Sequence, residues 1–186
     1  QTRREQLVLQ GHLPLRRAAQ GHPHRQRHDL LQRHDHLPWP WRVAEFVAGR
    51  SVTVVLGAHA SEIASALRQS AASVVLNRGW LEGLASSIRV AIESSPPRCD
   101  GLLLLLADQV AVTADDLKNL FVAWKRHPIL IASALYDGAP GLPAIFPRWT
   151  FPGLMELRGD RDPRPVLRRN IDQVVRIALK KFNLEP

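Results

Sequence analysis

The chain has 186 residues, of which 45% are hydrophobic and 23% are charged, and its formal net charge at pH 7 is +8. This length suits one domain with a sizeable core, and the composition is that of a globular protein. No apolar run reaches the roughly 18–20 residues that span a bilayer. The first residues lack the apolar stretch of a secretory signal, and a single cysteine excludes an internal disulfide framework. We therefore expect a cytoplasmic protein without a membrane partner.

The positive charge is concentrated in residues 1–42, which are rich in Arg, His, Gln and Pro and contain only three acidic residues. The rest of the chain is closer to electrical balance. A nucleic-acid-binding domain is expected to carry basic residues along an ordered face, interleaved with stacking aromatic side chains. Residues 1–42 have poor periodicity instead, so we expect no nucleic-acid partner.

The same segment contains a cluster of histidines, and imidazole is the commonest transition-metal ligand. A zinc site requires ligand pairs at defined spacings, and the cluster shows no repeated spacing. The alternatives are a solvated, partly disordered arm and a disturbed reading frame in a GC-rich gene, between which the sequence does not decide. The histidines concerned are His22, His24, His28, His34 and His36.

Regular patterning begins near residue 51. Residues 51–57 (SVTVVLG) form a β-branched apolar run that ends in glycine, which is typical of a buried strand. Ser61 is placed to cap a helix that extends to about residue 70, and residues 72–76 (ASVVL) predict a second strand. A loop follows over residues 77–83, and a helix is expected over residues 86–93. Residues 101–106 (GLLLLL) are the most apolar run and predict a central strand.

The second half continues the alternation. Thr113 and Asp116 form a capping-box pattern, which predicts a helix through Lys125. Strands are expected over residues 129–135, 142–146 and 174–178, with a turn over residues 136–141. Thr150 precedes a short helix, and Pro163 suits the first position of another helix that ends near Asn170. Short connections between alternating strands and helices predict an α/β fold, with a mostly parallel sheet covered by helices on both faces.

Asp108 is the candidate reactive residue. In parallel sheets, ligands bind beyond the carboxyl ends of the strands, and Asp108 follows the predicted central strand directly. A carboxylate at that edge suits a hard cation such as Mg²⁺, which is bound by one or two carboxylates together with substrate phosphates. The alternative is that Asp108 caps the turn that follows. Position alone does not separate these two roles.

Four motifs, in order, resemble those of the MobA-like nucleotidyltransferases, most closely the molybdenum cofactor cytidylyltransferases. Residues 77–87 (NRGWLEGLASS) resemble the family pattern N-x-x-W-x-x-G-x-x-S-S, and residues 106–110 (LADQV) resemble L-G-D-Q-P. Residues 141–146 (GLPAIF) resemble G-H-P-x-x-F, and residues 159–164 (GDRDPR) resemble G-D-x-G-A-R. The resemblance implies a Rossmann-like, three-layer nucleotidyltransferase fold. It also implies that a phosphate of molybdopterin attacks the α-phosphate of CTP, or of GTP, with Mg²⁺ present.

The resemblance also implies roles for individual residues. Asp108 is expected to be the catalytic residue and to bind the metal. Trp80 is expected to pack against the protein rather than to stack on a ligand. Asn77, Ser86 and Ser87 are expected to bind an anionic ligand at a helix start, although Ser86 and Ser87 are equally explained as helix caps, and Gly83 is expected to allow close backbone approach. The remaining expected nucleotide- or substrate-binding residues are Gln109, Gly141, Pro143 and Asp160.

The chain departs from the family pattern at several points. The family's glycine-rich phosphate-binding loop is absent, and residues 4–9 (REQLVL) resemble the segment that follows this loop. The family's D-I-D-T-P-E-D segment, with a second metal-binding aspartate, is also absent. Ala107, Val110 and Leu142 replace the family's Gly, Pro and His. Because positioning and electrostatics supply most of the catalysis of nucleotidyl transfer, we expect a weak or inactive enzyme.

These observations define two hypotheses. The first is a nucleotidyltransferase domain over residues 43–186, incomplete at both ends and preceded by the irregular basic segment 1–42. It acts on a nucleotide and a molybdopterin-type molecule, with a molybdoenzyme or its chaperone as a further expected partner. The second is a non-catalytic member of the same fold that binds a nucleotide, a pterin or a protein. The absent glycine-rich loop is the feature that distinguishes the two hypotheses.

Overall fold

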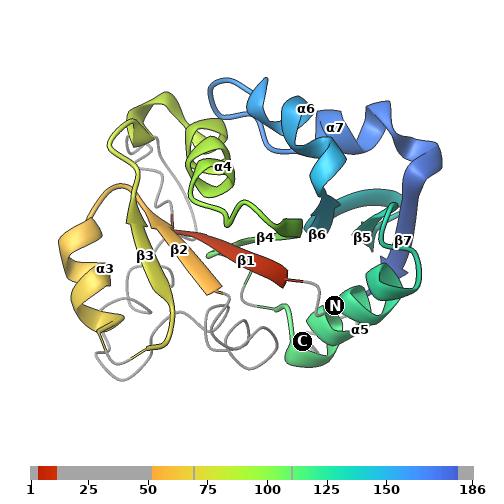
Figure 1. The fold of residues 1–186 in the computed structure, drawn as a ribbon, viewed down its shortest axis with the longest axis horizontal. Coiled ribbons are helices and arrows are strands. Elements are labelled where there is room, and N and C mark those ends of the chain that lie inside the picture. Colours follow the sequence, from red (N-terminus) through yellow and green to blue (C-terminus); the bar gives the residue numbers. More distant parts are fainter. Residues whose placement is uncertain (1–3, 12–51, 69, 110, 180–186) are drawn as a thin grey trace, which may run out of the picture.

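The computed structural model describes residues 4–11, 52–68, 70–109 and 111–179, and for residues 4–11 and Ala66 it describes the backbone only. These residues form a seven-stranded sheet in the order β3-β2-β1-β4-β6-β5-β7 (Figure 1). Its strands are β1 (Arg4–Gly11), β2 (Val52–Leu56), β3 (Ser73–Leu76), β4 (Cys99–Leu106), β5 (Ile131–Tyr136), β6 (Ala139–Pro147) and β7 (Val174–Ala178).

The sheet is mostly parallel. Strands β3, β2, β1 and β4 pair in parallel, as do β5 and β7, whereas β6 runs antiparallel to both β4 and β5. Strand β5 therefore points in the same direction as β4, and the carboxyl ends of both lie at the same edge of the sheet. At this edge β6 begins rather than ends. From β1 to β3 the strands are added on one side of β1, whereas β4 lies on its other side. The strand order therefore reverses between β1 and β4.

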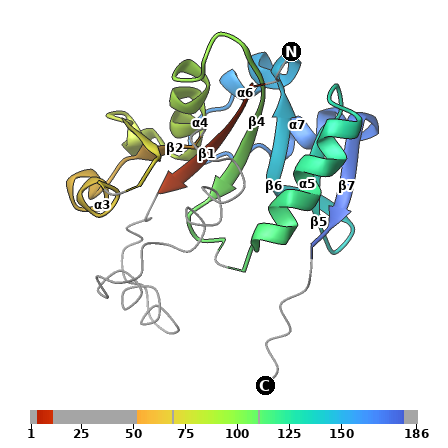
Figure 2. The same ribbon diagram turned by 60° about the horizontal axis from the view of Figure 1, so that its bottom comes forward.

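Helices cover both faces of the sheet, as the alternation of elements predicts (Figures 1 and 2). Residues of α3 and α5 pack on one face and residues of α4, α6 and α7 on the other. These helices are α3 (Ala60–Ala66), α4 (Leu84–Glu93), α5 (Ala114–Arg126), α6 (Phe151–Met155) and α7 (Arg164–Arg169), and three short 3₁₀ turns are η1 (Trp80–Glu82), η2 (Arg148–Thr150) and η3 (Ile171–Gln173). No helix in the described ranges is long and apolar enough to cross a membrane.

The leucine run of β4 is buried from both sides. Leu103 and Leu105 belong to the core beneath α3 and α5, whereas Leu102 and Leu104 belong to the core beneath α4, α6 and α7. Successive side chains of a strand point to opposite faces, so a central strand with helices on both sides is apolar at every position. The prediction of a central strand over residues 101–106 is confirmed.

Helix starts were predicted less well than strands. The capping box of Thr113 and Asp116 is confirmed: Thr113 Oγ1 accepts a hydrogen bond from Asp116 N at 3.2 Å, and Asp116 Oδ2 accepts one from Thr113 N at 3.0 Å. The prediction that Ser61 caps a helix is wrong, because α3 already begins at Ala60 after His59, whose φ is 56°. Pro163 is the residue that precedes α7 rather than its first residue.

Residues 4–11 have a different role from the one their sequence indicated. They form β1, which lies between β2 and β4 in the middle of the sheet, with Gly11 paired to Leu56 and Gln10 to Leu106. The segment is thus a central strand that leads to the carboxyl edge. Its resemblance to the family segment that follows the phosphate-binding loop is wrong, because a chain passing through the sheet centre toward that edge precedes such a loop. The histidine cluster lies outside the described residues.

The capping box provides a test of the fold. Thr113→Ala removes the acceptor for Asp116 N and should lower the free energy of unfolding by about 1 kcal/mol. Thr113→Ser keeps the hydroxyl and should retain most of the stability. Urea unfolding followed by circular dichroism measures both variants. Equal destabilisation by the two substitutions would show that the methyl group of Thr113, rather than its cap, stabilises α5.

Candidate functional site

The end of β4 carries an exposed carboxylate. Asp108 follows Leu106 by two residues, and its side chain is exposed although the strand beneath it is buried. Within the described ranges no residue donates a hydrogen bond to this carboxylate or pairs with it, and the cap of α5 is supplied by Thr113 instead. The alternative, that Asp108 caps the turn that follows it, stays a prediction, because this turn includes Val110, which lies outside the described residues. Asp108 is a rigidly based, solvent-facing anion.

Gln109 ties this turn to the neighbouring strand. Its Oε1 accepts a hydrogen bond from Leu106 N at 3.0 Å, and its Nε2 donates one to Leu142 O at 2.6 Å. The second bond crosses from the end of β4 to the start of β6. Both ends of the Gln109 amide are thus used to hold the backbone where the sheet changes direction. In this structure Gln109 supports the position of Asp108.

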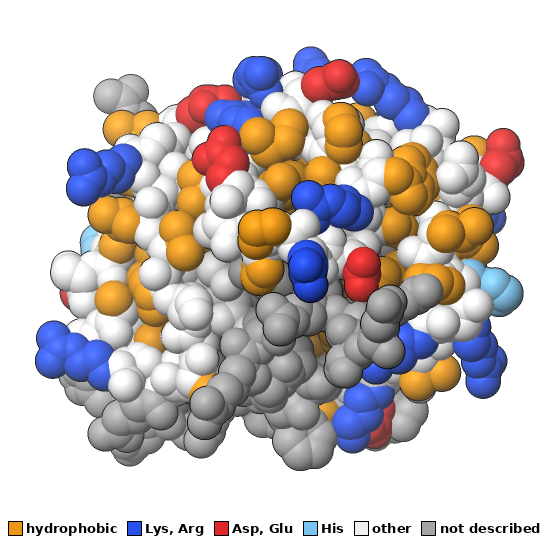
Figure 3. All heavy atoms as spheres, in the orientation of Figure 1, with side chains coloured by type: hydrophobic (Ala, Val, Ile, Leu, Met, Phe, Trp, Pro, Cys, Tyr) orange, Lys and Arg blue, Asp and Glu red, His pale blue; other side chains and the backbone are white. Residues whose placement is uncertain are grey.

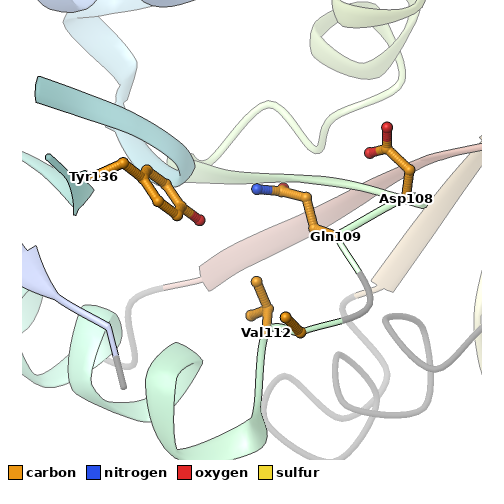
Figure 4. Close-up of a pocket in the computed structure, with 5 residues that line it drawn as sticks. Asp108, Gln109, Val112 and Tyr136 are labelled. Atoms are coloured by element: carbon orange, nitrogen blue, oxygen red, sulfur yellow. The ribbon is translucent and has the colours of Figure 1, made fainter. Parts of the chain in front are cut away.

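A hollow of about 280 Å³ lies beside this turn and is lined by Asp108, Gln109, Ala111, Val112 and Tyr136. Figure 4 shows the Tyr136 ring and the Gln109 amide directed toward each other, with the Asp108 carboxylate pointing away from Val112. Tyr136 ends β5 and is 44% exposed. Since the carboxyl ends of β4 and β5 share one edge, residues 28 positions apart in the sequence line one cavity.

The pKa of the Tyr136 phenol depends on its burial and on the neighbouring residues Asp116 and Gln109. Partial burial, followed by the negative charge of Asp116, raises the pKa of the Tyr136 phenol above its ordinary value of 10.0, whereas a hydrogen bond with the Gln109 side chain lowers it. Burial and the charge of Asp116 both disfavour the phenolate and outweigh the effect of Gln109, so the pKa is raised. The hydroxyl is therefore a neutral hydrogen-bonding group at physiological pH.

A second group of candidate residues lies after β3. Asn77 Nδ2 donates to Ser86 Oγ at 2.7 Å and to Ser87 Oγ at 2.8 Å, and Asn77 Oδ1 accepts from Gly79 N at 2.9 Å. All three side chains are at most 4% exposed. The structure thus brings together three residues that the motif predicted, and it uses their polar atoms within the protein. They fix the loop over residues 77–83 against the first turn of α4.

Gly83 permits a close backbone approach, as the motif implied, and the approaching group is another part of the chain. Gly83 has a φ of 112°, and a Cβ there would lie 2.4 Å from Asp160 Oδ1 and 2.6 Å from Gly159 C. Ala85 N donates to Gly159 O at 3.0 Å. Helix α4 consequently begins at Leu84, two residues earlier than predicted. Asp160 is exposed beside this helix start.

Trp80 is a packing residue, as the sequence indicated. A Cβ on Gly57 would lie 2.6 Å from Trp80 Cβ, so the Trp80 side chain packs directly against the backbone that follows β2. Arg89 of α4 reinforces the same corner, because it donates to Leu157 O at 2.7 Å and pairs with Glu82. The corner is thus held by contacts from three segments.

Gly141 and Pro143 lie at the start of β6. Both are buried, and a Cβ on Gly141 would lie 3.1 Å from Tyr136 Cδ2. Ser133 Oγ donates to Gly141 O at 2.7 Å. Gly141 therefore supports the Tyr136 ring. Gly141 has no side chain and Pro143 is buried, so neither residue offers an exposed side chain to a ligand.

The predicted residues thus form two groups at one edge of the sheet. Asp108 and Gln109 lie with Gly141 at the β4–β6 junction, whereas Asn77 and its partners follow β3. Strands β2 and β1 separate the two groups, which at about 4.8 Å per strand corresponds to roughly 14 Å. In the part of the chain that the structure describes, no three His, Cys, Asp or Glu side chains gather as a metal-binding cluster. Asp108 is a single carboxylate.

Sequence reasoning missed Tyr136, which it assigned to a turn. The signal was present, since an aromatic residue with a polar tip directly follows the strand predicted over residues 129–135. The parallel direction of β4 and β5 was needed to place Tyr136 and Asp108 around the same hollow. Only the sheet topology supplied it.

The fold and the site geometry define an α/β domain whose candidate residues gather at the carboxyl edge of a mostly parallel sheet. The family model of the MobA-like NTP transferase domain matches residues 26–174, and the chain belongs to this family. A search of curated proteins found no match.

Solved structures share the fold. The Rv0371c protein of Mycobacterium tuberculosis H37Rv, in complex with manganese, is 23% identical, with a TM-score of 0.72 over 96% of this chain and 89% of that one. The nucleotidyl transferase Mth528 of Methanothermobacter thermautotroptrophicus is 18% identical, with a TM-score of 0.69 over 95% and 87%. A CMP:2-keto-3-deoxy-manno-octonic acid synthetase complexed with CTP is 12% identical, with a TM-score of 0.60 over 95% and 90%. These likenesses establish the α/β nucleotidyltransferase architecture.

Crowding at Gly83 can be tested against a matched glycine. Gly83→Ala places a methyl group within 2.7 Å of Asp160 N as well as at a positive φ. Gly138 also has a positive φ, of 83°, but nothing lies within 4 Å of its Cβ position. We expect Gly138→Ala to cost about 1 kcal/mol and Gly83→Ala about 1–3 kcal/mol more. Equal losses in urea unfolding would contradict the close approach of residues 159–160.

The ionisation of Tyr136 can be observed directly, because it is the only tyrosine of the chain. Tyrosinate absorbance in an alkaline titration, with Tyr136→Phe as the blank, should show a pKa above 10.0. Gln109→Leu should raise it further, because the substitution removes the hydrogen bond that lowers it. Since the folded pKa lies above the unfolded one, the associated stability is present below pH 10 and declines as the pH rises through the folded value. A midpoint at or below 10.0 would refute the described environment.

Proposed function

We propose that this chain transfers a nucleoside monophosphate from a nucleoside triphosphate to the phosphate of a molybdopterin-type acceptor. The nucleotide is CTP in the cytidylyltransferase version of the reaction and GTP in the alternative version. An oxygen of the acceptor phosphate attacks the α-phosphorus, the bond to the β-phosphate oxygen breaks, and pyrophosphate leaves. The single observation that carries the proposal is the exposed Asp108, which has no pairing partner among the described residues, at the carboxyl end of β4, where the strand order reverses.

Asp108 suits a divalent cation that is bound together with the phosphates of a nucleotide. Mg²⁺ is commonly held by one or two carboxylates, several waters and the phosphates of a substrate. Among the described residues Asp108 belongs to no cluster of three or more metal-ligating side chains, and its exposure leaves room for water and phosphate. The donor set thus suits an ion that arrives with a nucleotide. The manganese complex of Rv0371c and the CTP complex of the synthetase support a metal and a nucleotide in this fold. The ion would neutralise charge around the transferred phosphorus.

The remaining residues position this arrangement. Gln109 holds the backbone of the Asp108 turn through its two hydrogen bonds. Asn77, Ser86 and Ser87 fix the loop after β3, so their contribution to nucleotide binding is to shape the edge of the sheet. Asp160, exposed next to Gly83, faces the same corner and is available to a ligand. Gly141 and Pro143 act through the position of β6.

The second candidate function is binding without transfer. It is favoured by the small number of charged groups at the edge, since Asp108 has no acidic or histidine cluster around it in the described ranges. Nucleotidyl transfer depends on preorganised charge around the phosphorus, and one carboxylate provides little of it. Under this alternative the chain binds a nucleotide with Mg²⁺ and releases it unchanged.

Calorimetric titration with CTP and with GTP, each with Mg²⁺, tests the site. Asp108→Asn should weaken Mg²⁺-dependent nucleotide binding by about tenfold or more, because the metal loses its protein carboxylate. Asp100→Asn is the matched control: Asp100 is also exposed and on β4, but it lies at the opposite end of the strand. This variant should bind as the wild-type chain does.

The outcomes separate the hypotheses. Binding by the wild-type chain with release of pyrophosphate on addition of molybdopterin supports transfer, whereas binding without pyrophosphate supports the second candidate. Equal affinities of Asp108→Asn and Asp100→Asn would remove Asp108 from the site. An absence of nucleotide binding by the wild-type chain would refute transfer and nucleotide binding, and would leave of the second hypothesis only the binding of a pterin or a protein.

A further inference from the structure

Tyr136 is a polar group at the candidate edge that the motifs did not identify. Its ring lies against Gly141, where a Cβ would come within 3.1 Å of the ring, and the residue remains 44% exposed. It lines the same hollow as Asp108 (Figure 4). A glycine behind the ring and a hollow in front of it leave the hydroxyl at the cavity wall. The phenol is therefore held in place and accessible.

The Gln109 amide, which faces the Tyr136 ring, is already engaged by the backbone (Figure 4). Gln109 Oε1 already accepts from Leu106 N, and one Nε2 hydrogen is donated to Leu142 O. A side-chain amide has a second Nε2 hydrogen. Burial and the charge of Asp116 raise the pKa of the Tyr136 phenol, so its hydroxyl keeps the proton that it can donate. Among the described residues the Tyr136 hydroxyl has no hydrogen-bond acceptor, so its proton is available to a ligand.

The place of the hollow indicates which ligand it receives. Asp108 follows β4 and lies between two regions of the sheet edge. On one side Asn77 and its partners follow β3, and on the other side the hollow lies beside β6 and β5. If the nucleotide occupies the first side, the acceptor approaches from the second. A volume of about 280 Å³ is just below the roughly 300–1,000 Å³ of pockets that enclose a whole ligand. The hollow thus accommodates a phosphate and its adjoining atoms.

We propose that the Tyr136 hydroxyl donates a hydrogen bond to the phosphate of the acceptor and so determines acceptor affinity. This inference rests on the proposed function, since it requires an acceptor phosphate beside Asp108. Ala111 and Val112 supply an apolar wall on the same side, which limits access of water to that bond. A hydroxyl that donates to an anionic oxygen forms a stronger bond than one between neutral groups. Gln109 acts as a positioning residue, because its two backbone hydrogen bonds hold the turn that borders the hollow.

Steady-state kinetics with Tyr136→Phe test the inference, because this change removes the hydroxyl and keeps the ring. The KM for molybdopterin should rise about 10- to 100-fold, as expected for the loss of a hydrogen bond to a charged group. The Kd for CTP with Mg²⁺ should stay within about twofold of the wild-type value. Trp149→Phe is the matched control: Trp149 is 43% exposed and donates to Ile129 O at 2.8 Å, and it lies near the amino end of β5, away from the hollow. It should leave both constants unchanged.

A spectroscopic measurement reports on the hydroxyl without turnover. The single tyrosine, labelled with ¹³C at Cζ, gives one resonance that belongs to Tyr136. Inorganic phosphate, added to the chain with Mg²⁺ and CTP, should shift this resonance in a saturable manner. The shift should persist in Trp149→Phe, and phosphate should bind more weakly to Tyr136→Phe by calorimetry.

Each result decides the proposal. Kinetics of Tyr136→Phe equal to those of the wild-type chain, or a resonance that phosphate does not move, would overturn it while Asp108 and nucleotide binding stand. A lowered kcat with an unchanged acceptor KM would assign Tyr136 a structural role and would also overturn it. A wild-type chain that neither binds CTP nor turns over would overturn the proposed function and this inference together.

Discussion

The bond from Gln109 Nε2 to Leu142 O, at 2.6 Å, joins the end of β4 to the start of β6, and the candidate site depends on it. These strands run in opposite directions, so one finishes where the other begins and their loops meet. With its carboxamide oxygen on Leu106 N, Gln109 satisfies backbone groups of both strands. Asp108 is carried on the turn that this amide fixes, and the Tyr136 ring rests on the glycine that precedes Leu142. One side chain thus sets the relative positions of an anion and a phenol.

The rigidity of that junction comes from burial on both sides of β4. Leu102 to Leu105 alternate between the two cores, each of which is closed by helices packed on one face of the sheet. A strand held in this way has little freedom to shift or twist, because interiors are close-packed. The polar residues begin where the leucines end, so the change from apolar to polar sequence coincides with the edge of the sheet. Asp108 is exposed to solvent because it lies just beyond this change from apolar to polar sequence.

The strands and the two-sided covering were predictable because they depend on local period and composition. The leucine run and the cap of α5 are examples: each signal lies within a few residues of its effect. The site was only partly predictable, since its contacts join distant positions. The Gln109–Leu142 bond spans 33 residues, and the contact of Gly83 with Gly159 is longer still. Asn77, Ser86 and Ser87 were found as a motif, but their burial, which turns them toward one another, depends on how α4 meets the β3 loop.

Under the proposed function, a single carboxylate at the edge makes metal and nucleotide binding depend on each other. Asp108 alone supplies too few ligands for tight binding of a hydrated divalent cation, and a triphosphate supplies the others. The cation in turn offsets the repulsion between the carboxylate and the phosphates. By linkage, each ligand must then raise the affinity for the other by the same factor. The Tyr136 phenol, neutral because burial and Asp116 disfavour its anion, adds a donor on the opposite side of Asp108 without adding negative charge. Under both proposals the edge thus combines a carboxylate for the cation with a neutral donor for the acceptor phosphate.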